Sequence, residues 1–156
     1  MSPTQSADYA EHLRLQDAAV QAFVDVLHRE RDILAVQPIS MAALSDVTEA
    51  KTAHANRLEN LESQRRIMAD AERSQAPYLD DADIAERLGC RDHWACLTGH
   101  IVEARTQNDI NGLAIQTRLD YTNRALGVLR KNAAKSLYAA DGQRRPSSQG
   151  RLRGGA

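Results

Sequence analysis

Apolar side chains recur at helical spacing along the first part of the 156-residue chain. Between residues 8 and 36 no Pro or Gly interrupts the pattern. A seven-residue spacing places side chains on one face of an amphipathic helix. This segment therefore predicts a first long helix, whose inward face carries Leu13, Val20, Leu27 and Leu34, with Phe23 and Val24 beside them.

The sequence "VQPIS" ends this helix, because Pro38 disfavours helical backbone at the residue before it. Ser40 is a good N-cap for a second helix over residues 41–75. So short a connection predicts that the second helix runs antiparallel to the first. Its seam repeats every three or four residues through Leu44, Val47, Lys51, His54, Leu58, Leu61, Arg65 and Met68.

Three positions of this second seam are polar, namely Lys51, His54 and Arg65. One interpretation is that their aliphatic stems lie on the neighbouring helix while their polar heads stay in water. The other is that the seam is left weak for a partner, since polar positions weaken a coiled coil. The sequence leaves both interpretations open.

Beyond Pro77 the pattern predicts a short helix over residues 81–88 that closes on Gly89, and then a third long helix over residues 91–135. Asn111-Gly112 lies inside this third helix, although it is also a strong hairpin-turn signal. Its flanks keep helical spacing, through Trp94, Leu97, Ile101 and Ala104 upstream and Ile115, Leu119, Leu126 and Leu129 downstream. Either the helix is continuous, and Gly112 costs about 1 kcal/mol but lets another helix approach closely, or a hairpin divides it.

These segments predict an all-α fold of three long helices in an elongated, antiparallel, coiled-coil-like arrangement, plus one short helix and no strands. After Tyr138 the composition changes to Gly, Ser, Pro and Arg, with Leu152 as the one large aliphatic residue. Such a segment buries too little apolar surface to offset its ordering entropy. We therefore expect a helical domain over residues 1–138 and a flexible basic tail over residues 139–156.

Composition argues against several classes of function. The formal net charge of -1 gives no field that would attract nucleic acid or an anionic membrane. The N-terminus lacks the apolar segment of a secretory signal, and no stretch approaches the ~20 apolar residues of a membrane span. We expect a cytoplasmic protein without membrane insertion, in which Cys90 and Cys96 are reduced thiols.

Cys90, His93, Cys96 and His100 have the residue types of a zinc site. One straight helix cannot wrap four ligands tetrahedrally around an ion, so we expect no metal there. The acidic stretch "YLDDADIAE" lacks the ligand order and the central Gly of a calcium loop. No phosphate-binding Gly loop or catalytic motif occurs, and we expect neither enzymatic activity nor a cofactor.

Three motifs follow one another in the second half of the chain: Asn108-Asp109-Ile110-Asn111-Gly112, then Ala125-Leu126-Gly127-Val128-Leu129, then Leu137-Tyr138-Ala139-Ala140-Asp141-Gly142-Gln143. In this order, on a helical frame of this length, they resemble the C-terminal half of the FlgN family of flagellar export chaperones. Weaker similarity upstream, over residues 48–51 and 61–66 and at Trp94, extends the resemblance to most of the chain. One departure is Ala139, because the family usually has Gly directly after the Tyr.

The resemblance implies a cytoplasmic chaperone that binds the C-terminal helical segments of the hook-filament junction proteins FlgK and FlgL. It would keep them from premature association and deliver them to the type III export gate protein FlhA, with no cofactor. The resemblance also favours a continuous helix through Asn111-Gly112.

The apolar pattern adds a candidate substrate-binding surface. Beyond Gly112 the apolar residues continue past the length that the short helix could cover, which leaves part of the stripe open to a partner helix. Asn108 and Asn111 share a helix face and can hydrogen-bond across a helix contact. The predicted surface comprises Asn108, Asn111, Gly112, Ile115, Leu119, Leu126 and Leu129. The alternative is that this stripe is intramolecular core.

Tyr138 is the predicted contact for the export gate, since an amphipathic ring with few rotors is a common interface anchor and the resemblance suggests FlhA. Alternatively, Tyr138 packs back on Leu137 and caps the third long helix. Two other functions remain open for the whole chain. One is a structural coiled-coil adaptor without a secretion role, and the other a metal-responsive regulator built on the Cys/His stripe.

Overall fold

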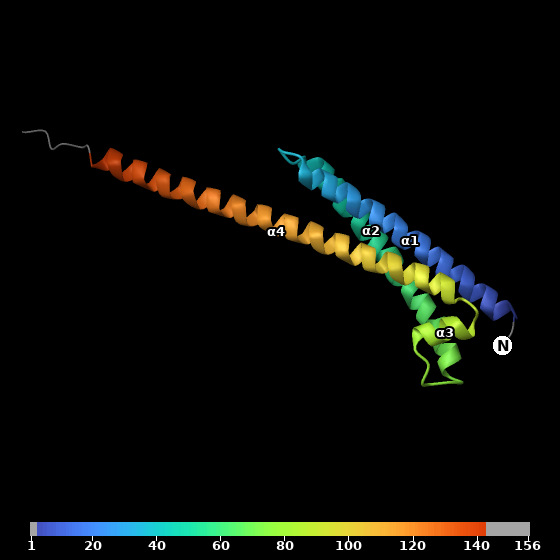
Figure 1. Cartoon of the computed structure of the whole chain (residues 1–156). Coiled ribbons are helices and arrows are strands. Elements are labelled where there is room, and N and C mark those ends of the chain that lie inside the picture. Colours follow the sequence, from blue (N-terminus) through green and yellow to red (C-terminus); the bar gives the residue numbers. More distant parts are fainter. Residues whose placement is uncertain (1–2, 143–156) are drawn as a thin grey trace, which may run out of the picture. The chain divides into compact units, whose positions relative to one another are not determined.

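The computed structural model describes residues 3–142 and divides the chain into two compact units, residues 1–115 (unit 1) and residues 116–156 (unit 2). Its helices are α1 (Pro3–Ala35), α2 (Met41–Arg73), α3 (Asp81–Arg87) and α4 (Arg91–Asp141), as labelled in Figure 1. The described residues contain no strand, which confirms the predicted all-α fold of three long helices and one short one. No helix of residues 3–142 has the length and apolarity needed to cross a bilayer.

Helices α1 and α2 run antiparallel in unit 1, as the short connection predicts. Ser40 caps α2, where its side-chain oxygen accepts a hydrogen bond from the backbone N–H of Ala43 at 3.2 Å. Near the start of α1, His12 Nε2 lies 2.8 Å from the carbonyl oxygen of Leu61, late in α2. Near the end of α1, Glu30 pairs with Lys51, early in α2.

Helix α3 is short because a capping box marks its start and a glycine follows its end. Asp80 accepts a hydrogen bond from the backbone N–H of Asp83, and the Asp83 side chain accepts one in return, which forms a capping box. Gly89 ends the segment with a φ of 70°, a left-handed conformation that favours glycine. The predicted stop at Gly89 is therefore confirmed.

Helix α4 is continuous through Asn111-Gly112, so the hairpin alternative is wrong and the continuous helix is confirmed. Within unit 1 the first part of α4 runs parallel to α1. His100 of α4 contacts Asp17 of α1, and further along α4 Asn111 bonds to Glu30, which also lies further along α1. The two helices therefore run in the same direction.

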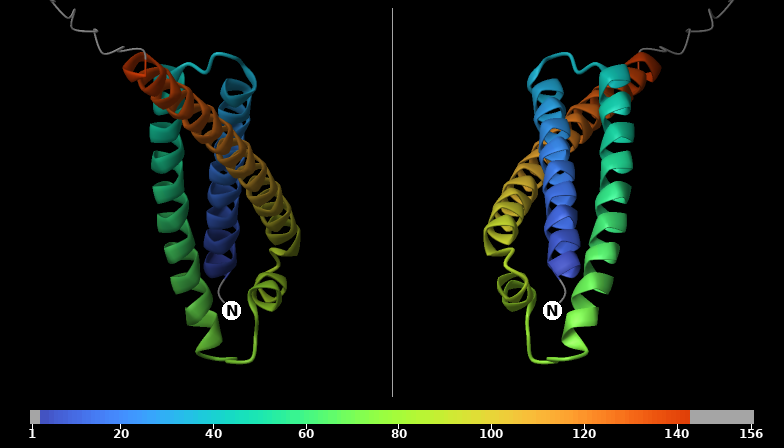
Figure 2. Two further views of the ribbon diagram at one scale, coloured as in Figure 1. Left: turned by 90° about the vertical axis from the view of Figure 1, so that its left-hand side faces the viewer. Right: turned by 90° about the vertical axis from the view of Figure 1, so that its right-hand side faces the viewer.

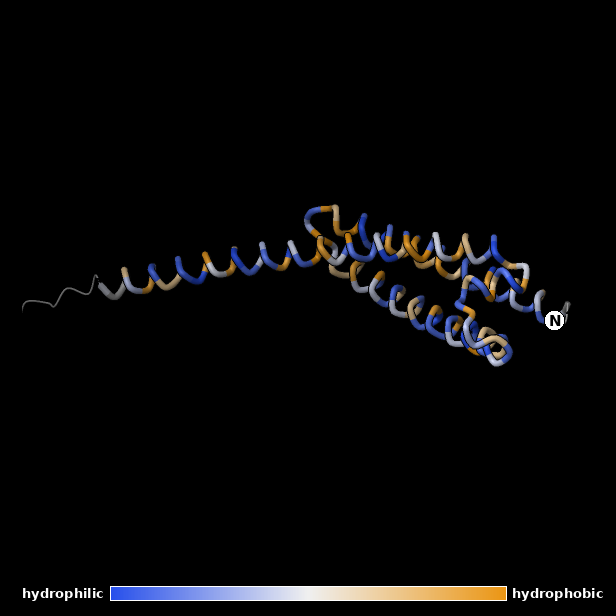
Figure 3. The backbone as a smooth tube through the Cα atoms, turned by 60° about the horizontal axis from the view of Figure 1, so that its bottom comes forward, coloured by the Kyte–Doolittle hydropathy of each residue, from blue (hydrophilic) through white to orange (hydrophobic). Residues whose placement is uncertain are grey.

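Helix α1 supplies more of the core of unit 1 than any other helix, and it lies between α2 and the first part of α4, as both views of Figure 2 show. The predicted heptad of α1 is buried throughout, with Leu13, Val20, Leu27 and Leu34 no more than 5% exposed. Colouring by hydropathy shows apolar and polar positions alternating along each helix, as amphipathic helices require (Figure 3). The remaining core comes from Tyr9, Val24, Ala69, Ile84, Ala85, Leu88, Cys90, Leu97 and Ala104.

The end of α4 lies further along the chain than the sequence pattern suggests. The helix continues past residue 135 to Asp141, through Ala139, and Gly142 N–H then bonds to the carbonyl oxygen of Tyr138 at 3.0 Å. The predicted tail over residues 139–156 therefore begins as helix. Residues 143–156 lie outside the described residues.

Candidate functional site

Asn111 is at the centre of a buried polar contact in unit 1. Its side chain is 1% exposed, and its Nδ2 donates to the carbonyl oxygen of Leu27 and to Glu30 Oε2, each at 2.8 Å. Its Oδ1 accepts a hydrogen bond from Gln107 Nε2 at 2.9 Å. The amide bonds across a helix contact, as predicted, but its partner is α1 of the same chain. The buried Asn111 side chain is therefore not available to another protein.

Glu30 connects this contact to α2. Its carboxylate is buried and pairs with Lys51 Nζ of α2 at 3.0 Å. Lys51 of α2 thus neutralises the buried carboxylate, and Asn111 of α4 donates a hydrogen bond to it. A buried carboxylate without such partners would be strongly destabilising. Glu30 could not be identified from the sequence, because the register of α1 against α2 and α4 follows only from the packed structure.

Arg65 corrects the prediction that its head stays in water, and it also contradicts a seam left weak at this point. Its side chain is 3% exposed and is paired with Glu62 and with Asp81 of α3, both at 2.9 Å. The guanidinium lies 5.1 Å from the ring centre of Trp94 in α4, a cation–π distance. Arg65 thereby connects α2 with α3 and α4.

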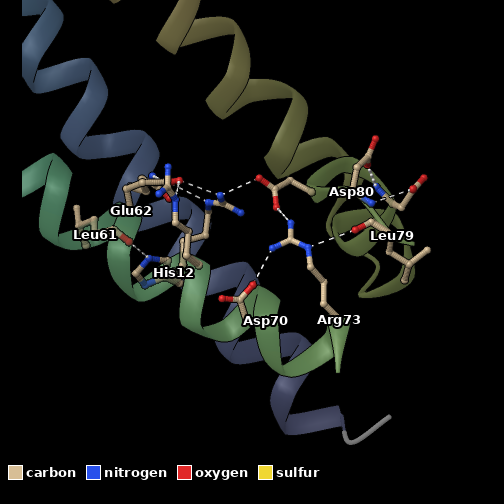
Figure 4. Close-up of polar contacts among 12 residues, drawn as sticks. His12, Leu61, Glu62, Asp70, Arg73, Leu79 and Asp80 are labelled. Carbon is tan, nitrogen blue, oxygen red and sulfur yellow. Dashed lines mark hydrogen bonds and ion pairs between the residues drawn. The ribbon is translucent and has the colours of Figure 1, made fainter. Parts of the chain in front are cut away.

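The acidic partners of Arg65 respond to it electrostatically. The hydrogen bond from Arg65 lowers the pKa of Glu62 from 4.5 to about 2. Burial alone would raise the pKa of Asp81, but hydrogen bonds from Arg65 and Arg73 outweigh it and lower that pKa. Arg73 also bonds to Asp70 and to the carbonyl oxygen of Leu79, which fastens the α2–α3 connection (Figure 4).

The cysteine and histidine side chains are dispersed. Cys90 is buried, and burial raises the pKa of its thiol, whereas Cys96 is exposed. His100 Nδ1 lies 2.6 Å from Asp17 Oδ1 on α1. Among residues 3–142 no three His, Cys, Asp or Glu side chains gather as potential metal ligands.

The other predicted site residues of unit 1 differ in exposure. Asn108 is half-buried and borders an apolar hollow, and Ile115 is half-buried. Gly112 is exposed, and a Cβ built on it would meet nothing within 4 Å. Within the described residues no helix approaches Gly112 closely, so the close approach predicted there stays a prediction about a partner.

The predicted leucines of unit 2 form an exposed line on α4. Leu119 is 52% exposed, Leu126 45% and Leu129 63%. Leu137, about five helical turns after Leu119, returns to the same side and is 71% exposed. We call Leu119, Leu126, Leu129 and Leu137 the unit-2 stripe. Leu137 was missed by the sequence analysis, although its spacing was a usable signal.

The unit-2 stripe continues a face of α4 that is buried within unit 1. There the same helical spacing places Leu97 and Ala104 in the core, at 0% and 6% exposure. One amphipathic pattern therefore has two environments along a single helix. In unit 1 it packs against α1, and in unit 2 its leucines are open.

Tyr138 is 82% exposed and its neighbour Leu137 is 71% exposed. A ring packed back on Leu137 as a cap would bury part of both side chains. The exposure of Tyr138 therefore leaves it available to another protein.

Comparisons with known proteins agree on one family. The family described as FlgN protein matches residues 1–146. The Salmonella typhimurium relative, named Flagella synthesis protein FlgN, is 33% identical over 125 residues, which cover 80% of this chain and 81% of the relative. Relatives of the same name are 27% identical over 131 residues in Proteus mirabilis (84% and 86% covered) and 26% over 141 residues in Escherichia coli K12 (90% and 93%). No solved structure matches the chain.

Proposed function

The chain belongs to the FlgN family, and from that premise we propose that it is a cytoplasmic export chaperone of the bacterial flagellum. It binds C-terminal helical segments of the hook-associated proteins FlgK and FlgL, prevents their premature assembly and delivers them to the export gate protein FlhA. The names of its relatives, flagella synthesis proteins, support the flagellar role.

The observation that carries this proposal is the exposed unit-2 stripe. A helix that presents leucines at helical spacing to water loses the free energy that their burial would provide, about 1.5–3 kcal/mol for each fully buried side chain. A partner helix whose apolar face covers the stripe recovers part of that energy. Helical recognition of this kind uses anchors spaced three, four or seven residues apart, which matches Leu119, Leu126 and Leu129.

The proposal is tested with the full chain and a C-terminal FlgK fragment, by isothermal titration calorimetry. Leu126→Asp should weaken binding about 30-fold or more, equivalent to ~2 kcal/mol, because it replaces an apolar contact with a charge that binding would bury. Val128→Asp is the matched control. Val128 is similarly exposed, at 57%, but lies two residues and thus ~200° further around the helix.

Equal weakening by the two substitutions would mean that the unit-2 stripe is not the contact. Absence of any complex between the wild-type chain and fragments of both FlgK and FlgL would refute the chaperone function. A permanent homodimer without such a complex would instead favour the structural adaptor. Circular dichroism of each variant establishes that the helices are retained.

A further inference from the structure

A groove lies between α2 and the first part of α4 in unit 1, with α1 as its floor. Two adjoining hollows form it, one of about 400 Å³ and one of about 210 Å³, which share Val20, Leu58, Ile101 and Arg105. Its apolar lining comprises Val20, Phe23, Leu58, Trp94, Leu97, Ile101 and Ala104, and Gln16 and several charged side chains also line the larger hollow. We call this the α2–α4 groove.

The dimensions of the groove suit a helix. Along α4 it extends from Trp94 to Asn108, a rise of about 21 Å or four helical turns at 1.5 Å per residue. Several of its apolar side chains are only half-buried, including Phe23, Leu58 and Ile101. An amphipathic helix laid over α1 would complete their burial.

Gln16, on the floor of the groove, has an unused hydrogen-bond acceptor. Its Nε2 donates to Glu62 Oε2 at 2.9 Å, whereas its Oε1 is fully buried and has no hydrogen-bond partner among residues 3–142. The residue is 4% exposed and lines the larger hollow. Because this oxygen has almost no accessible surface, it marks a polar position beneath the groove and not a contact for a bound helix.

Two charged residues at the borders of the groove are also unused. Glu59 on α2 and Arg105 on α4 are exposed, and neither pairs with another side chain in the described part of the chain. They stand on opposite borders of the groove. A helix with a basic flank toward Glu59 and an acidic group toward Arg105 would therefore be held in one orientation.

Unit 1 is acidic as a whole, although three acidic and three basic side chains line the groove itself, namely Glu59, Glu62 and Asp81 and Arg65, Arg66 and Arg105. Residues 1–115 contain 19 acidic and 11 basic side chains, whereas residues 116–156 contain two acidic and nine basic ones. The chain's net charge of -1 therefore averages an acidic unit with a basic one. An acidic unit attracts a basic partner over distances of about 8 Å in physiological salt.

We propose that the α2–α4 groove binds a basic amphipathic helix of a partner protein other than the export substrate. Its aliphatic face covers Phe23, Leu58 and Ile101, and its basic flank lies toward Glu59. The choice of a partner other than a second copy rests on the proposed function. A substrate on the unit-2 stripe covers this chain's own basic helix, which is then not free to enter the groove of a second copy.

The test uses two synthetic peptides of about 18 residues, the length of the groove with a short margin. Both carry the same leucine stripe, and their remaining positions are mostly Lys in one and mostly Glu in the other. Trp94 is the only tryptophan of the chain and lines the groove, so its fluorescence reports binding of Trp-free peptides. The Lys peptide should saturate at 1:1 and bind at least tenfold more tightly than the Glu peptide.

Substitutions locate the binding site within unit 1. Ile101→Gln should weaken the Lys peptide about tenfold, while Val102→Gln, at the adjacent exposed position, should leave its affinity unchanged. Glu59→Lys, an exposed position that the fold does not depend on, should weaken it several-fold even if Ile101→Gln proves unstable. Equal affinity for the two peptides, unmoved Trp94 emission, or no effect of both groove substitutions overturns the proposal.

Two further measurements separate the possible occupants. If the full chain sediments as a dimer that Ile101→Gln converts to a monomer, the occupant is a second copy and the proposal is overturned. If saturating FlgK fragment excludes the Lys peptide, and Ile101→Gln but not Leu126→Asp weakens that fragment, the groove is the substrate site and the proposal fails while the chaperone function stands. Binding of the Lys peptide to the loaded complex supports the proposal. Failure of the FlgK fragment to bind at all removes the proposed function but leaves the peptide result valid.

Discussion

Replacing Asn111 with Ala should destabilise unit 1 substantially. The substitution removes one hydrogen bond to the Leu27 carbonyl, worth about 1 kcal/mol, and one to the buried Glu30 carboxylate, worth about 2 kcal/mol. The bond from Gln107 is lost as well, but that half-buried side chain can bond to water instead. The expected loss is therefore about 3 kcal/mol. Lys51 still pairs with Glu30, so the carboxylate is not left without a counter-charge and the loss should not greatly exceed this value.

Urea unfolding followed by Trp94 fluorescence measures this effect, because Trp94 lies within unit 1. With an m value of about 1.5 kcal/mol per M, the midpoint should fall by about 2 M. Asn108→Ala is the matched control, since Asn108 is half-buried and its side-chain amide bonds to no other described residue. Its midpoint should change by less than about 0.5 M. A midpoint for Asn111→Ala no lower than that of the control would refute the role assigned to the buried amide.

Three further outcomes are expected. Gly112→Ala should increase the free energy of unfolding by up to about 1 kcal/mol and so raise the urea midpoint, because Ala is the better helix former and the added methyl group contacts no described residue. The contribution of Glu62 to stability should be fully present above pH 4.5 and be lost as the pH falls toward 2, because folding lowers its pKa. Glu62→Gln should therefore make the decline of the urea midpoint with falling pH less steep. Tyr138→Ala should weaken binding of the loaded chaperone to the FlhA cytoplasmic domain by ~2 kcal/mol in calorimetry without lowering the melting temperature. Tyr121→Ala, which changes an exposed tyrosine elsewhere on α4, should leave this binding unchanged.

The helices could be predicted because their signals are local. The heptad of α1, the N-cap at Ser40 and the stop at Gly89 each depend on residues within a few turns of one another. The change in composition after Tyr138 predicts an earlier end of α4 than the observed end at Asp141. Ala133, Ala134 and Ala139 are strong helix formers, and they favour continuation.

The site was harder to predict because its contacts join residues far apart in the sequence. The sequence pattern predicts that Arg65 is exposed in the seam, because no local signal indicates its contacts with Asp81 of α3 and Trp94 of α4. Asn111 reads as a surface contact until the register of α1 places Glu30 opposite it. The unit-2 stripe, by contrast, was largely predicted, since exposure there follows from helical spacing and from a shortage of chain to cover it.

The division of charge between the two units bears on how the protein behaves in purification. A sequence pI of about 6.5 and a net charge of -1 suggest weak retention on any ion-exchange resin near neutral pH. A quaternary-amine resin nevertheless meets the acidic residues 1–115, and a sulfonate resin meets the basic residues 116–156. The chain should therefore be retained by resins of both signs and elute only as salt screens each block of charge.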